Sequence, residues 1–491
     1  MLFNMSDILF VNQPRMNGIP VPREIDCANP QKDFLVQPLA LAYLASSARK
    51  EGCKVGLIDL NIMDKDYAYL IPVLKKEKPK IVISSFAIPS IFIDLELCRI
   101  VKQNCNAKVG IWGPIPSALR DFFYKKFPEL DFIIENEPEF TMQEIAKNLH
   151  KNKRDIFAKV KGLSYRKNRK IVFNGFRKLG NLDELPIPAY DLLQMNLYHT
   201  PYNRRLPMTI MRTSRGCVAR CTFCLIGGLD KIERGYGVPW RAQSAERTLK
   251  EIEYVYKNFG VREINFFDAE FTINKKRVKE ICKGVIEKKL DIMWNCNARV
   301  DLVDSETLKW MKKAGCYGIS YGVESINKKV VRLCKKNITA EQVENAVKLT
   351  KSAGIQPALY FMIGLPGETI GSIKETIAFA KKMALKYDLR PQCTIATPYP
   401  GTAFWNNAKK NSWIKEDLDK LEQTTASISY PHLSQQELEY WHEQFYKQVV
   451  LNPIRLIKRV LRIRHWNEIK SVPMHIKEFS VALFTRMKYV R

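Results

Sequence analysis

The chain has 491 residues, too many for one hydrophobic core, so two or three domains are expected. Its hydrophobic fraction of 46% and charged fraction of 26% are those of a globular protein and exclude a largely disordered chain. The 12 cysteines, behind an N-terminus without a secretion signal, are expected to be reduced intracellular thiols and not a disulfide framework. No transmembrane helix is evident in the sequence.

The chain carries 79 Lys and Arg against 51 Asp and Glu, a formal net charge of +28. Such an excess favours an anionic partner: nucleic acid, a membrane surface or an acidic small molecule. A lysine-rich composition without any such partner explains it equally well. Because the lysines are spread along the chain instead of forming one tract, nucleic acid is not an expected partner.

Residues 1–150 alternate short apolar runs with amphipathic segments, which predicts an α/β domain with a Rossmann-like, doubly wound parallel sheet. The predicted strands are Ile8–Val11, Val55–Ile58, Ile81–Ser84, Val109–Trp112 and Phe132–Ile134. The predicted helices are Pro38–Lys50, Tyr67–Lys76, Phe92–Lys102 and Ser117–Lys126. Such a sheet binds ligands at the carboxyl ends of its strands, but no G-x-G-x-x-G follows the first strand, so a dinucleotide site is not expected.

Residues 151–202 are predicted to be a linker with a β-hairpin, Leu163–Arg166 against Lys170–Phe173, and a proline-stiffened extended stretch. From 203 to 405 the β/α alternation resumes with six units, fewer than the eight of a closed TIM barrel, which predicts a partial (β/α)6 barrel. The strands predicted there are Thr209–Thr213, Glu263–Phe267, Met293–Asn297, Gly318–Tyr321, Ala358–Ile363 and Cys393–Ala396. The helices expected between them include Ala245–Lys257, Lys275–Lys288 and Ile373–Lys386.

Residues 406–491 are predicted to form a helical, basic C-terminal region. Within 453–491, apolar residues interleave with Arg and Lys, which is typical of a basic amphipathic helix that lies on an anionic membrane. The alternative is a helix packed on the barrel with its basic face in solvent.

Three cysteines, Cys217, Cys221 and Cys224, follow the first predicted barrel strand in a C-x3-C-x2-C spacing. Thiolates this close can hold one metal cluster, and since a closed iron–sulfur cubane needs four ligands, three leave one metal position open. In an α/β barrel the chemistry lies at the carboxyl ends of the strands, where this loop is predicted. The alternatives are a zinc site completed by a distant histidine, or three unrelated buried cysteines.

This spacing, with Phe223 just before the last cysteine, resembles the cluster loop of the radical S-adenosylmethionine (radical SAM) superfamily. The N-terminal loops resemble the cobalamin-binding domain of one branch of that superfamily, which contains methyltransferases and anaerobic oxidative cyclases. These loops are Asn12-Gln13-Pro14, Trp112-Gly113-Pro114 and 135–139. The chain departs from the branch at Trp112, where a glycine is usual, and at Asn136.

The resemblance implies three sets of site residues. Cys217, Cys221 and Cys224 would hold a 4Fe–4S cluster and form the catalytic centre. S-adenosylmethionine would be bound through its amino group by Asp268 and Glu270, its ribose by Glu324 and Ser325, and its adenine by Gly364. Arg299 would hold its carboxylate or, alternatively, a neighbouring acidic residue. Cobalamin would be bound by Asn12, Ser84, Trp112 and Gly113. The alternative for the two acidic residues is an ordinary helix start.

The resemblance also implies a function. Reductive cleavage of S-adenosylmethionine would give a 5′-deoxyadenosyl radical, used for cobalamin-dependent methylation of an unactivated carbon. No histidine precedes His150, so the cobalt would have no histidine ligand from the first domain. The alternatives are a non-methylating radical reaction such as oxidative cyclisation, a first domain that is only structural, and a non-catalytic scaffold that binds RNA or membrane.

The expected partners are a small-molecule substrate, which would be a lipid or another hydrophobic molecule if the tail lies on a membrane, and a flavodoxin- or ferredoxin-type electron donor. The expected location is the cytoplasm, with peripheral contact to the inner membrane face through residues 453–491.

Overall fold

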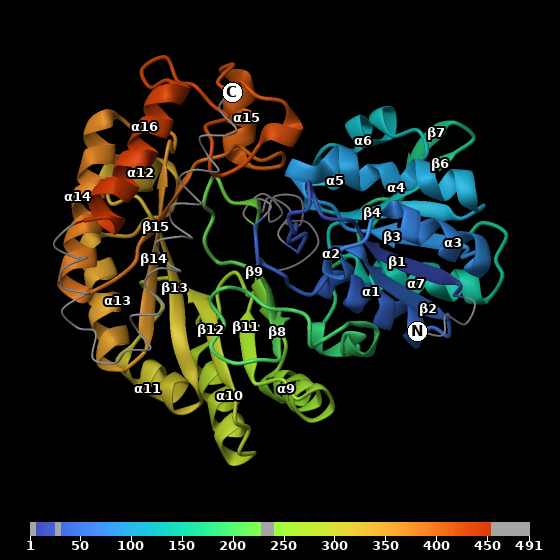
Figure 1. The fold of residues 1–491 in the computed structure, drawn as a ribbon, viewed down its shortest axis with the longest axis horizontal. Helices are drawn as coiled ribbons and strands as arrows, with labels where there is room; N and C mark the ends of the chain where they lie inside the picture. Colours follow the sequence, from blue (N-terminus) through green and yellow to red (C-terminus); the bar gives the residue numbers. More distant parts are fainter. Residues whose placement is uncertain (1–5, 25–30, 227–239, 453–491) are drawn as a thin grey trace.

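The computed structural model describes residues 6–24, 31–226 and 240–452, and two sheets side by side organise them (Figure 1). The first sheet has the strand order β2-β1-β3-β4-β5-β6-β7. Its parallel strands are β1 (Ile8–Asn12), β2 (Val55–Asp59), β3 (Ile81–Ser84), β4 (Lys108–Gly113) and β5 (Phe132–Glu135). All five strands predicted for this domain are confirmed, with ends that differ by one residue at most.

The helices of this domain cover both faces of the sheet, as a doubly wound fold requires. They are α1 (Leu39–Lys50), α2 (Leu60–Met63), α3 (Tyr67–Glu77), α4 (Ile91–Asn104), α5 (Pro114–Ala118), α6 (Arg120–Lys126) and α7 (Glu139–His150). Every residue of β1, β3 and β5 is buried, which explains their unbroken apolar sequences.

One expected helix is wrong: the segment from Ser117 to Lys126 forms α5 and α6 instead of one helix. Pro114 starts α5 directly after β4, because proline suits the first position of a helix. Leu119, with φ −120° and ψ 32°, leaves the helical region and separates the two.

The predicted hairpin is present as β6 (Leu163–Lys167) and β7 (Lys170–Phe173). It does not stand alone, because β6 pairs antiparallel with β5 and widens the first sheet. Two residues of the following stretch, Tyr190 and Tyr198, are buried, and Tyr190 donates a hydrogen bond of 2.9 Å to Glu251 on α9 (Ala245–Phe259). This stretch therefore packs between the two sheets.

The second sheet has six parallel strands in the order β15-β14-β13-β12-β11-β8, which confirms the partial (β/α)6 barrel. Its strands are β8 (Met208–Met211), β11 (Glu263–Phe266), β12 (Met293–Ala298), β13 (Cys316–Glu324), β14 (Gln356–Ile363) and β15 (Gln392–Ile395). Its helices, after α9, are α10 (Lys275–Glu287), α11 (Ser305–Lys313), α12 (Lys328–Leu333), α13 (Ala340–Ser352) and α14 (Ile370–Tyr387). They cover the outer face, and the inner face turns toward the first domain (Figure 1).

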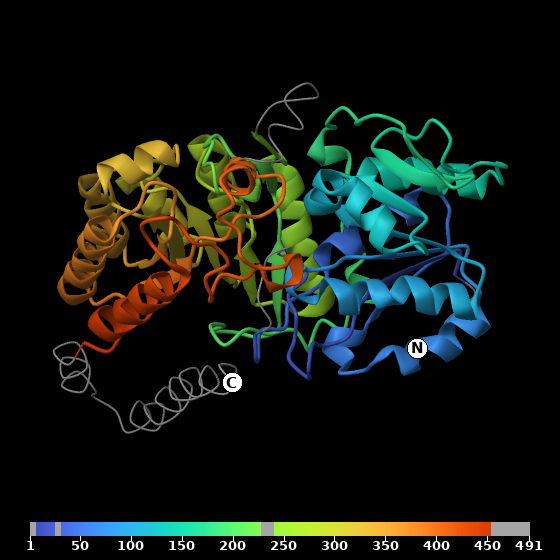
Figure 2. The same cartoon turned by 90° about the horizontal axis from the view of Figure 1, so that it is seen from above.

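The last described segment contains α15 (Ala403–Lys410), α16 (Gln435–Phe445) and a π-helical turn, Tyr446–Val450. Tyr399 and Leu421 belong to the same apolar cluster as Leu9 and Ile111 of the first sheet. This segment therefore joins barrel and first domain (Figure 2). Among the described helices, none has the length and apolar composition needed to cross a bilayer. The tail helix predicted in 453–491 lies outside the described residues.

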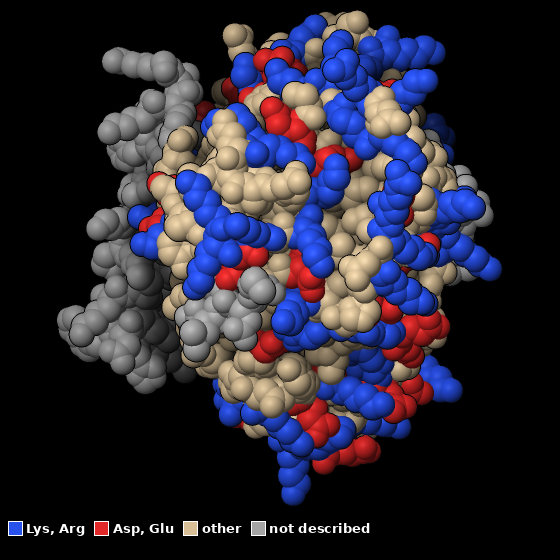
Figure 3. Space-filling model, turned by 90° about the vertical axis from the view of Figure 1, so that its right-hand side faces the viewer, with Lys and Arg blue, Asp and Glu red and all other residues tan. Residues whose placement is uncertain are grey.

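Lys and Arg cover much of the first domain's outer face, with Asp and Glu between them (Figure 3). Positive and negative side chains are thus intermixed over this face.

Candidate active site

The cysteine loop begins where β9 (Ser214–Gly216) ends, at the carboxyl end of β8. Cys221 is buried, and Cys217 and Cys224 are half-buried. Burial raises the pKa of Cys217 and of Cys221, the latter to about 11, and the nearby Cys224 adds to both rises. The three thiols lie on one loop. Within the described residues, however, no three His, Cys, Asp or Glu side chains are arranged so that they could hold a metal ion.

Two backbone hydrogen bonds hold the middle of the loop. The Thr222 amide donates to the Cys334 carbonyl at 3.0 Å, and the Phe404 amide donates to the Thr222 carbonyl at 2.9 Å. Cys334 follows α12 and Phe404 lies in α15. The cysteine loop is therefore held from the barrel and from the C-terminal segment at once.

Two partly buried ion pairs hold the base of the loop against the first domain. Arg215 and Arg241 face each other across the antiparallel pair of β9 and β10 (Trp240–Ala242), where like charges repel. Arg215 donates to Glu139 at 2.5 Å, and Arg241 donates to Glu137. Both glutamates follow β5, so the turn after this strand and the start of α7 neutralise the arginines beside the cysteine loop. We call these two pairs the interdomain latch.

Asp268 connects β11 to the chain just before the cysteine loop. Its fully buried carboxylate accepts hydrogen bonds from the Thr213 amide and hydroxyl, both at 3.1 Å, and from the Ser214 hydroxyl. Burial raises its pKa. Asp268 lines the cavity, but its carboxylate is already bonded to the approach to the loop, which gives it a positioning role.

Glu270 and Arg299 lie next to one another at the ends of β11 and β12. The Glu270 carboxylate is buried and accepts from the Thr272 amide at 2.8 Å and from the Arg299 amide. The Arg299 guanidinium donates twice to Asp301, at 2.9 Å each. Its Nη1 is buried and has no partner among the described residues. The charge of Arg299 opposes the burial-driven rise in the pKa of both Cys217 and Cys221. This side chain therefore lies beside the cysteine loop.

Glu324 ends β13 in the left-handed region, with φ +65°. It accepts a hydrogen bond of 3.2 Å from Lys336, a nearly buried lysine. A side chain at Gly322 would leave no room for this pair, since its Cβ would lie 2.5 Å from the Glu324 Oε1. Lys336 also opposes the rise in the pKa of Cys221, which places its charge at the loop. Sequence analysis missed Lys336, because one lysine among many gives no signal.

Ser325 and Gly364 are both engaged in hydrogen bonds within the protein. Ser325 is fully buried, and its hydroxyl lies 3.1 Å from the Thr376 hydroxyl on α14. The Gly364 amide donates to Glu368 at 2.5 Å, and its carbonyl accepts from Tyr430 at 2.8 Å. Both residues hold the barrel's carboxyl edge together. Their predicted contacts to ribose and adenine stay predictions.

The residues predicted to contact cobalamin lie at one edge of the first sheet. Asn12, Ser84, Trp112 and Gly113 are at the carboxyl ends of β1, β3 and β4. Five buried polar atoms along this edge have no partner in the described part of the chain: Asn12 Oδ1, Gln13 Oε1, Ser85 Oγ, Trp112 Nε1 and Asn136 Oδ1. Buried polar groups are normally hydrogen-bonded, so such a row fits a polar ligand at this edge. Of these, sequence analysis named Gln13 and Asn136 only as parts of the N-terminal loops, and it missed Ser85.

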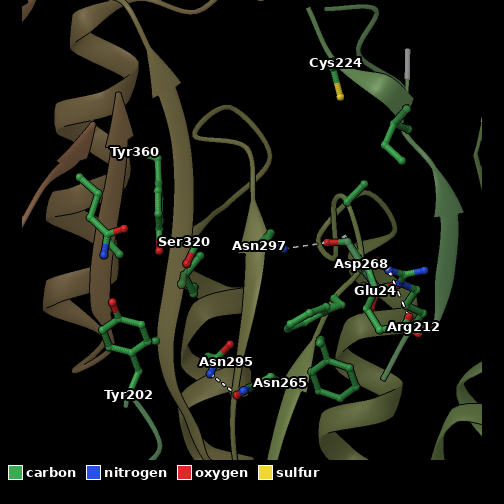
Figure 4. Close-up of a pocket in the computed structure, with 18 of the residues that line it drawn as sticks. Glu24, Tyr202, Arg212, Cys224, Asn265, Asp268, Asn295, Asn297, Ser320 and Tyr360 are labelled. Atoms are coloured by element: carbon green, nitrogen blue, oxygen red, sulfur yellow. Dashed lines mark hydrogen bonds and ion pairs between the residues drawn. The ribbon is translucent and has the colours of Figure 1, made fainter. Parts of the chain in front are cut away.

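One cavity of about 1500 Å³ connects these parts. Trp112 and Asn136 line it from the first domain, and Cys224 and Asp268 line it from the barrel. It continues down the inner face of the barrel, past Asn297, Ser320 and Tyr360 to Asn265 and Asn295 (Figure 4). The cysteine loop and the ends of β4 and β5 therefore open into one space, whereas Asn12, Ser84 and Gly113 are not among the residues that line it.

Comparison with known proteins gives the family. Residues 211–380 match the model of the radical SAM superfamily. An uncharacterised methyltransferase of Pyrococcus horikoshii is 33% identical over 427 residues, which cover 86% of this chain and 90% of the relative. The chain belongs to the radical SAM superfamily.

Two further similarities are to longer proteins, which this chain covers only in part. It is 27% identical, over 76% of its length and 60% of the relative's, to the anaerobic magnesium-protoporphyrin IX monomethyl ester cyclase of Cereibacter sphaeroides. Its fold resembles that of OxsB, a cobalamin-dependent S-adenosylmethionine radical enzyme, with a TM-score of 0.71, 20% identity and coverage of 97% of this chain and 71% of OxsB. The protein is thus a radical SAM enzyme, which acts on a substrate and needs a reductant.

Proposed function

We propose that this radical SAM enzyme methylates an unactivated carbon of a small molecule with the help of cobalamin. The observation that carries the proposal is the single cavity shared by the cysteine loop and the ends of β4 and β5, at the carboxyl edge of the first sheet. A methyl donor held at that edge would face the same space as a radical generated at the loop. The relative of Pyrococcus horikoshii is named a methyltransferase, and OxsB has been solved with aqua-cobalamin and S-adenosylmethionine bound.

The residues present fit these groups. Cys217, Cys221 and Cys224 would hold a 4Fe–4S cluster and leave one iron open. The unpartnered Arg299 Nη1 suits the carboxylate of S-adenosylmethionine, as a charge-assisted hydrogen bond. Two of the five unpartnered atoms, Trp112 Nε1 and Asn136 Oδ1, belong to residues that line the cavity, and they suit the polar rim of a corrin. When bound, cluster, S-adenosylmethionine and cobalamin would supply radical generation and methyl transfer.

This chain's own residues position those groups and exclude water. The interdomain latch fixes the base of the cysteine loop to the first domain, and Asp268 fixes the chain just before the loop to the end of β11. Trp112, nearly buried on the cavity wall, shields the space from solvent. We further propose a flavodoxin- or ferredoxin-type reductant and a cytoplasmic location, supported by the free cysteines among the described residues.

The test is a product ratio. Reconstituted protein with cobalamin, reductant and a small-molecule extract of cells that carry the gene should form 5′-deoxyadenosine and S-adenosylhomocysteine in about equal amounts, since one S-adenosylmethionine gives the radical and another the methyl group. Cys221→Ala should abolish the first product. If 5′-deoxyadenosine forms without S-adenosylhomocysteine, methylation is excluded and an oxidative reaction, as in the cyclase relative, takes its place.

A further inference from the structure

The cysteine loop meets the cavity on one side and solvent on another. Phe223, Cys224 and Leu225 line the cavity. Val218 and Arg220, which lie between the first two cysteines, are exposed, Val218 with 48% of its surface. A substrate in the cavity and a partner protein in solvent can therefore reach this loop from different sides.

The loop lies beside the end of α12. The Thr222 amide donates to the Cys334 carbonyl at 3.0 Å, directly after this helix, and the Thr222 carbonyl accepts from the amide of Phe404 on α15. The loop is thus placed between α12 and α15, at the carboxyl end of the barrel (Figure 1). Leu333, the last residue of α12, is 46% exposed and touches the turn at Gly367, where a Cβ would lie 2.3 Å from the Leu333 Cδ1. Both the loop and the helix end therefore present an exposed apolar side chain.

The same helix end carries a concentration of positive charge. Between Asn327 and Ile338 the chain has five basic residues and no acidic one. Four of the five are exposed, and we call them the basic rim: Lys328, Lys329, Arg332 and Lys335. Within the described part of the chain, none of these four makes an ion pair.

Acidic neighbours compensate one end of the basic rim more than the other. Near Lys328, Glu341 is exposed, and hydrogen bonds at the start of α13 together with the charge of Lys328 hold its pKa below the ordinary value. Glu375 also lies at this end, where it accepts a hydrogen bond of 2.7 Å from the residue before Lys328. At the other end, beside the cysteine loop, Glu324 is already paired with Lys336. The positive charge of the basic rim is therefore least compensated next to the loop.

Such a surface suits a transient protein partner of opposite charge. Electron-transfer encounters have small interfaces, and complementary charge brings the two proteins together quickly without a tight contact. On the outer face of the first domain, basic and acidic side chains are intermixed (Figure 3), whereas the basic rim has no acidic residue between its members. The enzyme needs a reductant, and the basic rim lies where a protein in solvent comes close to the cysteine loop.

We propose that an acidic one-electron carrier protein, of the flavodoxin or ferredoxin type, docks on the basic rim to reduce the enzyme. One electron leaves the reduced carrier and lowers the oxidation state of the cluster on the cysteine loop by one, and no bond is made or broken. This docking surface rests on the proposed function only in requiring that the loop hold a cluster. Iron content and the S-adenosylhomocysteine formed with dithionite test the proposed function separately, because neither involves the basic rim.

The test uses the reconstituted full chain with purified flavodoxin and, separately, with purified ferredoxin. The double variant Arg332→Glu with Lys335→Glu should weaken binding of the carrier at least about tenfold, because it places negative charge against an acidic partner. The rate of 5′-deoxyadenosine formation at a given carrier concentration should fall by a similar factor. Raising the salt concentration from about 0.05 M to about 0.5 M should weaken wild-type binding too, since salt screens exposed charges. With dithionite, which needs no docking surface, the variant and the wild type should form 5′-deoxyadenosine at the same rate.

The matched control is the double variant Lys348→Glu with Lys351→Glu. Both lysines are exposed in the last turns of α13, toward the opposite end of the barrel, and they have the same spacing and the same change of charge. This variant should bind the carrier and form 5′-deoxyadenosine as the wild type does. Equal effects of the two double variants, an equal loss of the dithionite-driven rate, or binding of neither carrier would overturn the proposal. Vesicles of phosphatidylglycerol that bind the wild type but not the variant of Arg332 and Lys335 would also overturn it, since a membrane would then be the occupant.

Discussion

At the scale of single residues, the proposed cluster depends on three thiols within eight positions of the chain. Replacing Cys217, Cys221 or Cys224 with Ala should lower iron to background after anaerobic reconstitution and abolish 5′-deoxyadenosine formation, because a cubane left with two protein ligands is not retained. Iron analysis and product quantification measure both effects. Cys105→Ala, in the first domain, should behave as wild type; equal iron content in all four variants would show that the loop holds no cluster.

Arg299 is expected to contribute to S-adenosylmethionine binding through its unpartnered Nη1. Arg299→Gln should weaken binding about 10- to 100-fold, since one charge-assisted hydrogen bond contributes about 1.5–3 kcal/mol. Equilibrium binding to the reconstituted protein measures this effect, with iron content unchanged. Arg205→Gln is the matched control, because its ion pair with Asp291 lies at the surface, where such pairs contribute little. Equal affinities of the two variants would exclude the contact.

Glu368 should make stability depend on pH. Burial raises its pKa to about 8 in the folded protein, well above the ordinary glutamate value. Between these two values the folded state holds a proton that the unfolded state has lost, so stability falls as pH rises, by up to about 1.4 kcal/mol per pH unit, and levels off above about pH 8. Glu368→Gln should remove this dependence and be more stable than wild type at pH 8. If the melting temperatures of the two proteins changed with pH in the same way from pH 5 to 9, this effect of Glu368 would be contradicted.

At the scale of elements, the interdomain latch predicts a stability effect. Glu139→Gln leaves Arg215 without its buried partner and should destabilise the protein by about 3 kcal/mol. Glu144→Gln is the matched control, because Glu144 lies on the same helix as Glu139 and its ion pair with Arg177 is more exposed. This substitution should destabilise the protein by less than about 1 kcal/mol. Denaturant unfolding measures both. An equal loss in the two variants would mean that the latch is an ordinary surface contact.

Elements with local signals were predictable, and elements set by distant partners were not. The strands of both sheets follow from apolar runs, and the cysteine loop follows from spacing within one turn of chain. The pairing of β6 with β5 depends on residues that are close only after folding. The same holds for the latch and for Lys336 beside Glu324, 12 positions apart across a barrel loop. Charged residues outside a recognisable motif carry no individual signal in a chain this basic, so only the structure identifies which of them are buried and paired.

At the scale of the whole molecule, the first domain determines how cobalamin would be held. Because residues 1–149 contain no histidine, bound cob(II)alamin should give an electron paramagnetic resonance spectrum without nitrogen superhyperfine splitting from a protein imidazole. The large side chain of Trp112 lies at the cavity wall, where it would crowd a bound corrin. Splitting that disappears in a variant of one of the 6 histidines would show a ligand from elsewhere in the chain.

We propose that one cavity of this chain brings a cluster and a corrin together. The most direct measurement is anaerobic reconstitution with iron, sulfide and hydroxocobalamin, followed by gel filtration and quantification of iron and cobalt per chain. We expect about four iron atoms from one 4Fe–4S cluster and about one cobalt in the same protein peak. Iron without cobalt would reduce the first domain to a structural role, and cobalt without iron would contradict the assignment of the cysteine loop.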